Sequence, residues 1–298
     1  MSADADKEHR TNILRAAFWM LGAVGSFSLM AVAGREVSFE LDTFEIMTYR
    51  SLAGIVIVLT IVILTGRQKE LRTQRLGLHI SRNIFHFAGQ NLWFFALTLI
   101  PLAQLFALEF TTPLWVLILS PIFLGERLTN MRVLSALIGF IGILIVARPS
   151  PETLNIGTMT AAAAAIGFAG AMIFTKKLTR TETLACIMFW LTLTQSIFGL
   201  ICAGIDGDMA LPSTTSAPWL IVIAICGLLA HFCITSALSI APATLVSPID
   251  FTRLPVIALV GYVLYNEPID GFVILGALII FGANYLNLWS ETRKKPKI

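Results

Sequence analysis

EFTTPLWVLILSPIFLGE, residues 109–126, is apolar enough to cross a lipid bilayer and yet begins with a carboxylate. A second stretch, DFTRLPVIALVGYVLYNE, occupies residues 250–267 and follows the first at an offset of 141 residues. Each copy opens with an acid, Phe and Thr, and each closes seventeen residues later on Glu. An ionisable group inside a membrane segment is a functional candidate by default. Two such groups at equivalent places indicate a membrane protein built from a repeat.

The composition restricts the class of protein. Of the 298 residues, 56% are hydrophobic and only 13% are charged, and the mean hydropathy is +0.81. Apolar runs of about 18 residues or more, each able to span the ~30 Å hydrocarbon core of a bilayer, recur with short polar breaks. The sequence therefore predicts an all-α polytopic membrane protein. The net charge of +3 does not indicate a nucleic-acid partner, because the basic residues flank the predicted spans.

The apolar runs predict ten transmembrane helices in two halves. Residues 1–12 are expected to form a disordered N-terminal tail, residues 13–148 and 157–290 two five-helix halves, and residues 291–298 a basic tail. The ten spans are placed at 13–34, 44–65, 79–99, 102–124, 131–148, 157–175, 184–204, 218–240, 243–265 and 270–290.

The distribution of Lys and Arg predicts the orientation in the membrane. If the N-terminus is cytoplasmic, 17 of the 21 basic residues, Arg82 among them, fall in inner segments, and only Arg35 and Arg148 fall in outer loops. Arg50 and Arg253 lie within spans. Because cytoplasmic loops are enriched in Lys and Arg, both termini are predicted to be cytoplasmic.

The two halves are related by a constant offset. Shifted by 141 residues, Ile46-Met47 matches Ile187-Met188, and Pro101 matches Pro242. Since each half has five spans, an odd number, the second half enters the membrane with the opposite orientation. The predicted architecture is a 5 + 5 inverted-topology repeat.

Short motifs add to this pattern. They are Thr43-Phe44-Glu45 entering the second span, His79-Ile80-Ser81-Arg82 entering the third, Phe123-Leu124-Gly125-Glu126 at the end of the fourth and Tyr265-Asn266-Glu267-Pro268 at the end of the ninth. On these motifs and the repeat, the chain resembles the drug/metabolite transporter superfamily, in particular its EamA-domain branch. The resemblance implies a bacterial cytoplasmic-membrane protein similar to amino-acid exporters and S-adenosylmethionine uptake transporters. It also implies a central cavity lined mainly by spans 1, 3, 4, 6, 8 and 9.

Four charged residues within spans are candidates for substrate binding or ion coupling. Arg253 follows Asp250 by three positions and shares its helix face, so the two either form a self-neutralising pair or present Arg253 to a substrate anion. Glu109 has no basic residue at i±3 or i±4. It either binds a substrate amine, exchanges a proton or stays protonated beside a neighbour. Arg50 is expected to reach outward to lipid headgroups or to pair with Glu109 or Glu45.

A polar stripe on the third span supplies further candidates. His86, Gln90 and Trp93 follow one another at helical spacing, and the repeat places His231 at the position of Gln90. Polar groups at membrane depth need partners, so the stripe should face the interior of the bundle. Hydrogen bonding between helices is the alternative to substrate contact.

Several residues have structural interpretations. Pro113, Pro248 and Pro255 are expected to bend their helices, and Glu126 to form a cap or an ion pair at a helix end. Small residues four apart predict close helix contacts, at Gly22/Ser26, Ala163/Gly167 and Ser135/Gly139.

The sequence thus predicts a secondary transporter that moves a small polar metabolite by alternating access. An amino acid or amino-acid-like zwitterion, S-adenosylmethionine included, is the favoured substrate. A facilitator or proton-coupled exporter of amphipathic cations is the alternative. An intramembrane enzyme and a lipid-interacting scaffold are disfavoured, because no nucleophile motif and no soluble domain are found. No cofactor or metal is expected, and the chain is either a monomer or a homodimer.

Overall fold

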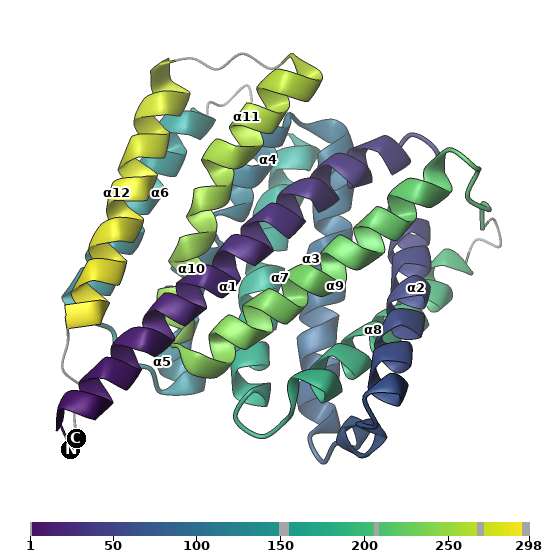
Figure 1. Cartoon of the computed structure of the whole chain (residues 1–298). Helices are drawn as coiled ribbons and strands as arrows, with labels where there is room; N and C mark the ends of the chain where they lie inside the picture. Colours follow the sequence, from purple (N-terminus) through teal and green to yellow (C-terminus); the bar gives the residue numbers. More distant parts are fainter. Residues whose placement is uncertain (1, 149–154, 206–208, 267–270, 294–298) are drawn as a thin grey trace.

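A computed structural model describes residues 2–148, 155–205, 209–266 and 271–293, and within these ranges the chain is helical without strands (Figure 1). The helices of the first half are α1 (Ser2–Val37), α2 (Thr43–Leu64), η1 (Gln68–Leu71), α3 (Leu76–Leu99), α4 (Leu102–Glu109), α5 (Thr112–Leu124) and α6 (Asn130–Ala147). Those of the second half are α7 (Ile156–Leu178), α8 (Leu184–Ala203), α9 (Ser216–Ile240), α10 (Ala243–Ile249), η3 (Asp250–Thr252), α11 (Arg253–Tyr265) and α12 (Gly271–Arg293).

Each predicted span coincides with a helix or with a pair of helices, but one expectation was wrong. The N-terminal tail is not disordered: α1 begins at Ser2 and runs without interruption into the apolar segment. Its first residues include Ala, Glu, Lys and Arg, which favour helix and lose little side-chain entropy there. Glu267 and residues 294–298 of the basic tail lie outside the described residues.

The fourth and ninth spans are interrupted near Pro113 and Pro248, two of the prolines expected to bend them. The segment 102–124 is interrupted between Glu109 and Thr112, and the segment 243–265 contains the 3₁₀ turn Asp250–Thr252. The breaks lie at the same place in the two halves and at the two acids. Proline explains them, because Pro113 sits at the start of α5 and Pro248 near the end of α10, where a missing N–H and the ring prevent a regular helix.

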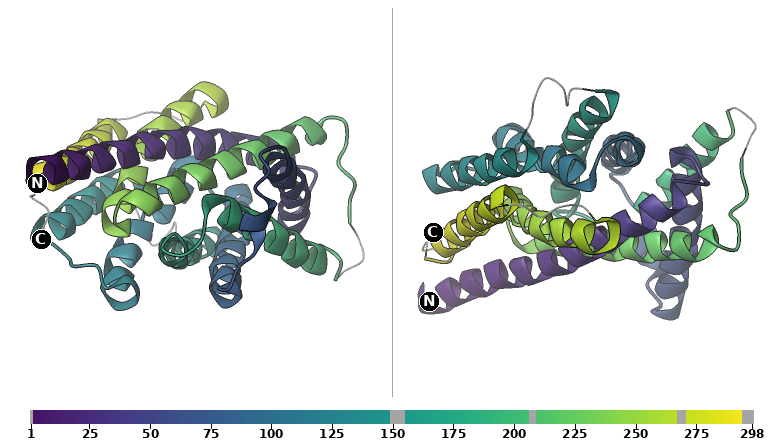
Figure 2. Two further views of the ribbon diagram at one scale, coloured as in Figure 1. Left: turned by 60° about the horizontal axis from the view of Figure 1, so that its bottom comes forward. Right: turned by 90° about the horizontal axis from the view of Figure 1, so that it is seen from above.

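The helices form two layers (Figure 2). Helices α1, α9, α11 and α12 lie in one layer, and α3, α4, α6 and α7 lie in the other (Figure 1). Helix α1 packs along α9, as its repeat equivalent α7 packs along α3, while α2 packs on α8 and α6 on α12. Exchange of the two halves maps this set of contacts onto itself, as expected for halves related by a pseudo-twofold axis.

Glycines allow the closest of these approaches. A Cβ on Gly167 of α7 would lie 2.7 Å from Gly89 Cα of α3, and one on Gly22 of α1 would lie 2.8 Å from the Sγ of Cys233 on α9. Both glycines belong to the small-residue pairs singled out in the sequence. They let helix backbones approach where larger side chains would separate them.

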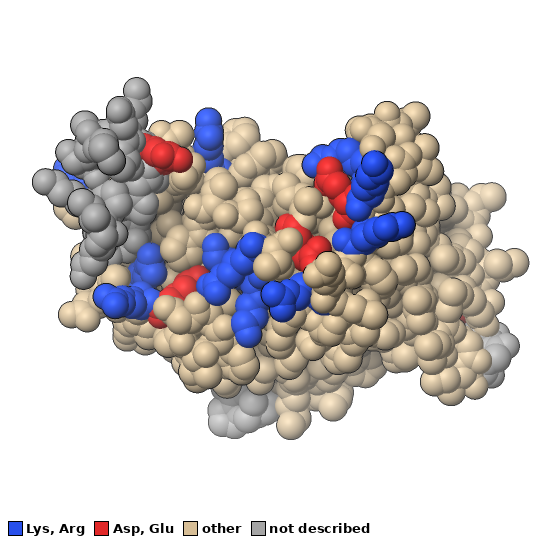
Figure 3. Space-filling view, turned by 90° about the horizontal axis from the view of Figure 1, so that it is seen from below, with Lys and Arg blue, Asp and Glu red and all other residues tan. Residues whose placement is uncertain are grey.

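The surface fits a multi-pass membrane protein. Among the described residues, eight helices are long and apolar enough to cross a bilayer, and a ninth apolar segment, Asn130–Val146, is shorter. Helix α3 has the length but carries buried polar side chains, including Arg82, His86 and Gln90. The beginning of α1 and the end of α12 lie at the same end of the molecule, on the face where Lys and Arg gather (Figures 1 and 3). The full set of ten membrane-spanning helices remains a prediction.

Candidate functional site

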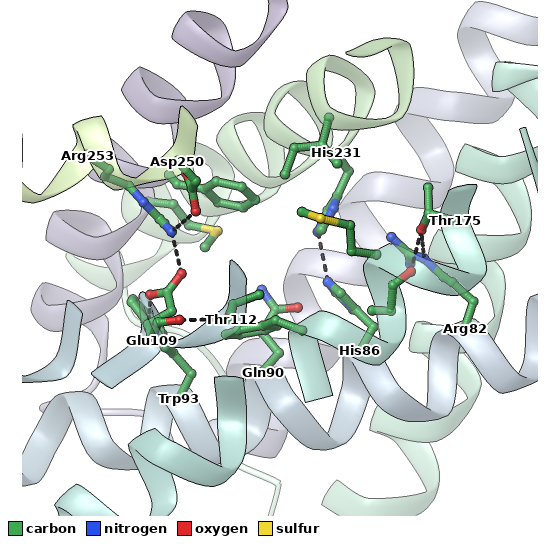
Figure 4. A pocket seen from close by; sticks show the side chains of 16 residues that line it. Arg82, His86, Gln90, Trp93, Glu109, Thr112, Thr175, His231, Asp250 and Arg253 are labelled. Carbon is green, nitrogen blue, oxygen red and sulfur yellow. Dashed lines mark hydrogen bonds and ion pairs between the residues drawn. The ribbon is translucent and has the colours of Figure 1, made fainter. Parts of the chain in front are cut away.

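A cavity of about 80 Å³ lies between the two layers (Figure 4). Its walls come from α1, α3, α4, α5, α7, α9, η3 and α11, which correspond to the predicted spans 1, 3, 4, 6, 8 and 9. Seven of the eight residues proposed from the sequence line it: His86, Gln90, Trp93, Glu109, His231, Asp250 and Arg253. The charged residues lie at opposite ends of the cavity, with the acidic residues at one end and Arg82 at the other (Figure 4).

The acidic end of the cavity joins two acids to one guanidinium. The Nη2 of Arg253 donates to Glu109 Oε1, and it also donates to Asp250 Oδ2 at 2.7 Å. The side chain of Arg253 is only 3% exposed. Asp250 and Arg253 pair along one turn, and another span supplies the basic partner that Glu109 lacks on its own helix. With all three groups ionised, this acidic cluster of Glu109, Asp250 and Arg253 has a formal charge of −1.

The broken helices place this cluster. Glu109 is the last residue of α4, and Asp250 begins the 3₁₀ turn that leads to Arg253. Thr112, the first residue of α5, donates its hydroxyl to the Glu109 carbonyl at 2.6 Å and so satisfies a backbone group that the break frees. Trp93 of α3 donates its indole N–H to Glu109 Oε2 at 2.6 Å.

Aromatic rings surround the guanidinium. The Arg253 Cζ lies 4.9 Å from the ring centre of Phe27, 5.0 Å from that of Phe106 and 5.2 Å from that of Phe110. Ring faces attract cations, and here they also exclude water, which strengthens the ion pairs. Two polar atoms of the cluster, Asp250 Oδ1 and Arg253 Nε, are buried without a hydrogen-bond partner in the described part of the chain.

Two histidines meet in the cavity wall. The Nε2 atoms of His86 on α3 and His231 on α9 are 2.8 Å apart, so one imidazole donates to the other. Figure 4 shows this pair between the acidic cluster and Arg82. The side-chain oxygen of Gln90, one turn from His86, has no partner among the residues that the structure describes. The pair joins the polar stripe of α3 to His231, the residue of α9 that the repeat aligns with Gln90.

Arg82 lies at the other end of the cavity, and the sequence did not identify it as a site residue. Its HISR motif begins the predicted third span, and Arg82 was counted among the inner basic residues. The structure places it six residues into α3, 3% exposed, on the cavity wall. Its Nε donates to Thr175 Oγ1 at 3.2 Å and its Nη1 to Asn83 Oδ1 at 2.8 Å. No carboxylate within the described ranges lies in ion-pair distance of it.

Arg50 contradicts both expectations for it. Its side chain is buried, so it does not reach lipid headgroups, and it pairs with neither Glu109 nor Glu45. It lines a second, smaller cavity together with His231. The glutamate of its own helix is occupied elsewhere, since Glu45 accepts N–H groups of Asp42 and Ala210.

Two further groups have structural explanations. Glu126 accepts the backbone N–H groups of Ala243 and Thr244 at 2.9 and 3.2 Å, which makes it the predicted cap at the start of α10. The ligand atoms of His79, Glu182 and Cys186 lie within 4.8 Å of one another, a cluster that the sequence spacing did not reveal. These are zinc-type ligands, but the Cys186 thiol donates to Glu182 at 3.3 Å, and the cluster lines neither cavity.

Comparisons with known proteins agree with this architecture. The model of the EamA-like transporter family matches residues 14–148 and again residues 155–289. The S-adenosylmethionine uptake transporter of Rickettsia bellii is 27% identical over 94% of this chain and 95% of its own length. Riboflavin transporters of Brucella anthropi and Vibrio cholerae are 32% and 29% identical, over 89% and 95% of this chain and 95% and 96% of theirs. A solved structure described as "Crystal structure of protein" shares the fold, with a TM-score of 0.75 at 16% identity over 91% of this chain and 95% of its own.

Proposed function

This chain belongs to the EamA-like transporter family, and from that premise we propose that it carries a small zwitterion across the bacterial cytoplasmic membrane by alternating access. That it is a multi-pass transporter of small metabolites, and not an enzyme, follows from the family and from relatives named as metabolite transporters. The finer proposal is the substrate class: an amino acid or an amino-acid-like molecule such as S-adenosylmethionine.

One observation carries this proposal: the cavity is acidic at one end and basic at the other (Figure 4). The cluster of Glu109, Asp250 and Arg253 offers a formal charge of −1, and Arg82 offers an uncompensated guanidinium. A zwitterion would place its ammonium group against the free Asp250 Oδ1 and its carboxylate toward Arg82. The polar groups left open by the protein would then be satisfied by the substrate.

The two broken helices suggest how the site changes access. Each contributes an acid at its break, and Arg253 ties the two acids together across the halves. A substrate ammonium that competes for Asp250 or Glu109 would loosen that tie, allowing one half to rock against the other. In this proposal the ten helices form an inverted repeat, and both termini face the cytoplasm.

The alternative is a facilitator or a proton-coupled exporter of amphipathic cations. The net negative cluster among Phe27, Phe106 and Phe110 favours it, because aromatic and acidic groups together suit an organic cation. Arg82 distinguishes the candidates, since a cation gains nothing from a guanidinium at the other end of the cavity.

Flux into proteoliposomes tests the proposal. The purified protein is reconstituted, and uptake of radiolabelled amino acids, S-adenosylmethionine, riboflavin and a quaternary ammonium drug is measured. Saturable flux of a zwitterion is expected. Flux of riboflavin alone or of the cation alone contradicts the substrate class, while flux of none of them contradicts transport of these metabolites. A pH-sensitive dye in the lumen separates proton-coupled transport from facilitation.

A further inference from the structure

Arg50 is buried without an anion. Its side chain on α2 is 6% exposed, and its one polar contact is Met30 Sδ, 4.0 Å from Nη1. Throughout the described ranges no carboxylate oxygen lies within ion-pair distance of it. Desolvating a lone guanidinium is costly, and natural proteins therefore pair buried charges. A counter-ion is the simplest way to satisfy this one.

The second cavity lies beside this guanidinium and is small. It has a volume of about 10 Å³, and its polar lining consists of Arg50, Ser51, Thr192, Gln195 and His231. That volume holds roughly one water-sized particle. A monatomic anion is of this order of size and needs only N–H and O–H donors, of which a guanidinium alone supplies five. A carboxylate or phosphate group requires more room.

The balance of charge around the two cavities also favours a bound anion. Their walls hold three guanidinium groups, Arg50, Arg82 and Arg253, and two carboxylates, Glu109 and Asp250. The ionised set therefore carries a formal charge of +1, which a zwitterionic substrate does not change. One monovalent anion brings it to zero.

We propose that a chloride ion binds beside Arg50 in the second cavity and is a resident part of the transporter. His231 lines both cavities and bonds to His86, so the ion sits one residue away from the substrate site. Its charge holds the Arg50 guanidinium in the gap beside Gly227, where a Cβ would lie 3.6 Å from Nη1. This inference does not depend on which metabolite is carried.

Thermal unfolding in graded chloride tests the proposal. The purified protein is heated in mixtures of sodium chloride and sodium gluconate at constant ionic strength, without substrate. Because an ion that binds the folded form raises Tm by mass action, Tm should climb with chloride and level off at saturation. Bromide should act similarly. Arg50→Gln should lose this response, and Arg15→Gln, which removes the same charge from an exposed position on α1, should keep it.

Two outcomes overturn the proposal: a wild-type Tm that does not respond to chloride, or an equal response in Arg50→Gln. If Arg50→Gln cannot be purified, the wild-type titration and Ser51→Ala, which removes a lining hydroxyl but keeps the charge, decide the matter. Thr192 is less suitable, because its hydroxyl already donates to the carbonyls of Met188 and Phe189. Loss or weakening of the response in Ser51→Ala supports the site, and an unchanged response refutes it. If the anion is instead the carboxylate of the substrate, chloride has no effect without substrate and inhibits uptake competitively, which also refutes a resident ion.

Discussion

Glu109 and Arg253 stand 144 positions apart in the sequence, yet their side chains form an ion pair almost closed off from solvent. Glu109 ends α4 in the first half, and Arg253 begins α11 in the second. The bond therefore crosses between the two halves, at the broken part of each helix. If one half rocks against the other, the ion pair between Glu109 and Arg253 must be strained or replaced. The proposed substrate site therefore lies where the two halves would move relative to each other.

Arg253→Gln should abolish transport and destabilise the fold. It leaves Glu109 and Asp250 buried side by side without a cation, and removing one partner of a buried pair typically costs about 3–5 kcal/mol. The measurement is uptake into proteoliposomes together with the unfolding transition of the purified variant. Arg67→Gln is the control, because it removes the same charge from a pair with Glu70 whose arginine is 53% exposed. Wild-type transport by a well-folded Arg253→Gln would refute the role assigned to the cluster.

Arg82→Gln should weaken binding of zwitterions selectively. A hydrogen bond to a charged group contributes about 1.5–3 kcal/mol, so the Kd for an amino acid should rise by roughly 10- to 100-fold. The amide of the same amino acid, which lacks the carboxylate, should bind the variant and the wild type alike. Both constants are measured by calorimetry on the purified protein.

The control for this variant is Arg75→Gln, which removes an exposed charge just before α3. Equal weakening of the amino acid and its amide by Arg82→Gln would mean that Arg82 supports the fold and does not bind a carboxylate.

The sequence predicted the helices well because apolar runs bounded by polar turns specify a membrane segment almost alone. It located the two acids and expected bends at Pro113 and Pro248, but it did not show that the helices are interrupted there, because a continuous apolar run such as 102–124 looks like a single helix. The sequence could not predict the ion pair between Glu109 and Arg253, for a physical reason. Sequence spacing reveals partners three or four residues apart on one helix, such as Asp250 and Arg253, but it does not show which side chains on different helices pair.

The sequence also misplaced two arginines, Arg82 and Arg50, for different reasons. Arg82 adjoins a polar loop, so counting charges assigned it to the membrane surface, although α3 begins earlier and carries it inward. Arg50 lies inside an apolar run, where the two common explanations, reaching to headgroups and pairing with an acid, both proved wrong. Which way each side chain points depends on packing with α7, α8 and α9.

Thr112→Val should destabilise the broken helix. The Thr112 hydroxyl donates to the Glu109 carbonyl at 2.6 Å and approaches the Ala165 carbonyl at 3.3 Å, so valine would leave the buried Glu109 carbonyl without this donor. The expected loss is about 1–3 kcal/mol of unfolding free energy. Thr98→Val is the matched control, since that hydroxyl bonds Phe95 on the exposed side of α3. The effect is read from denaturation curves, and equal losses in the two variants would contradict it.

Gly139→Ala should impair transport although α6 does not line the cavity. A Cβ on Gly139 would lie 2.5 and 2.7 Å from two ring carbons of Phe251. Phe251 is the middle residue of the 3₁₀ turn that begins at Asp250. Phe251 is fully buried against Phe110, so the ring cannot move without shifting the acidic cluster, and overpacking typically costs about 1–3 kcal/mol. We expect a lower maximal rate of uptake and a lower Tm. Gly282→Ala on α12 meets no atom within 4 Å and should leave both unchanged or slightly raise Tm. Normal uptake by Gly139→Ala would show that the 3₁₀ turn tolerates displacement, and the proposed coupling between α6 and the site would then fail.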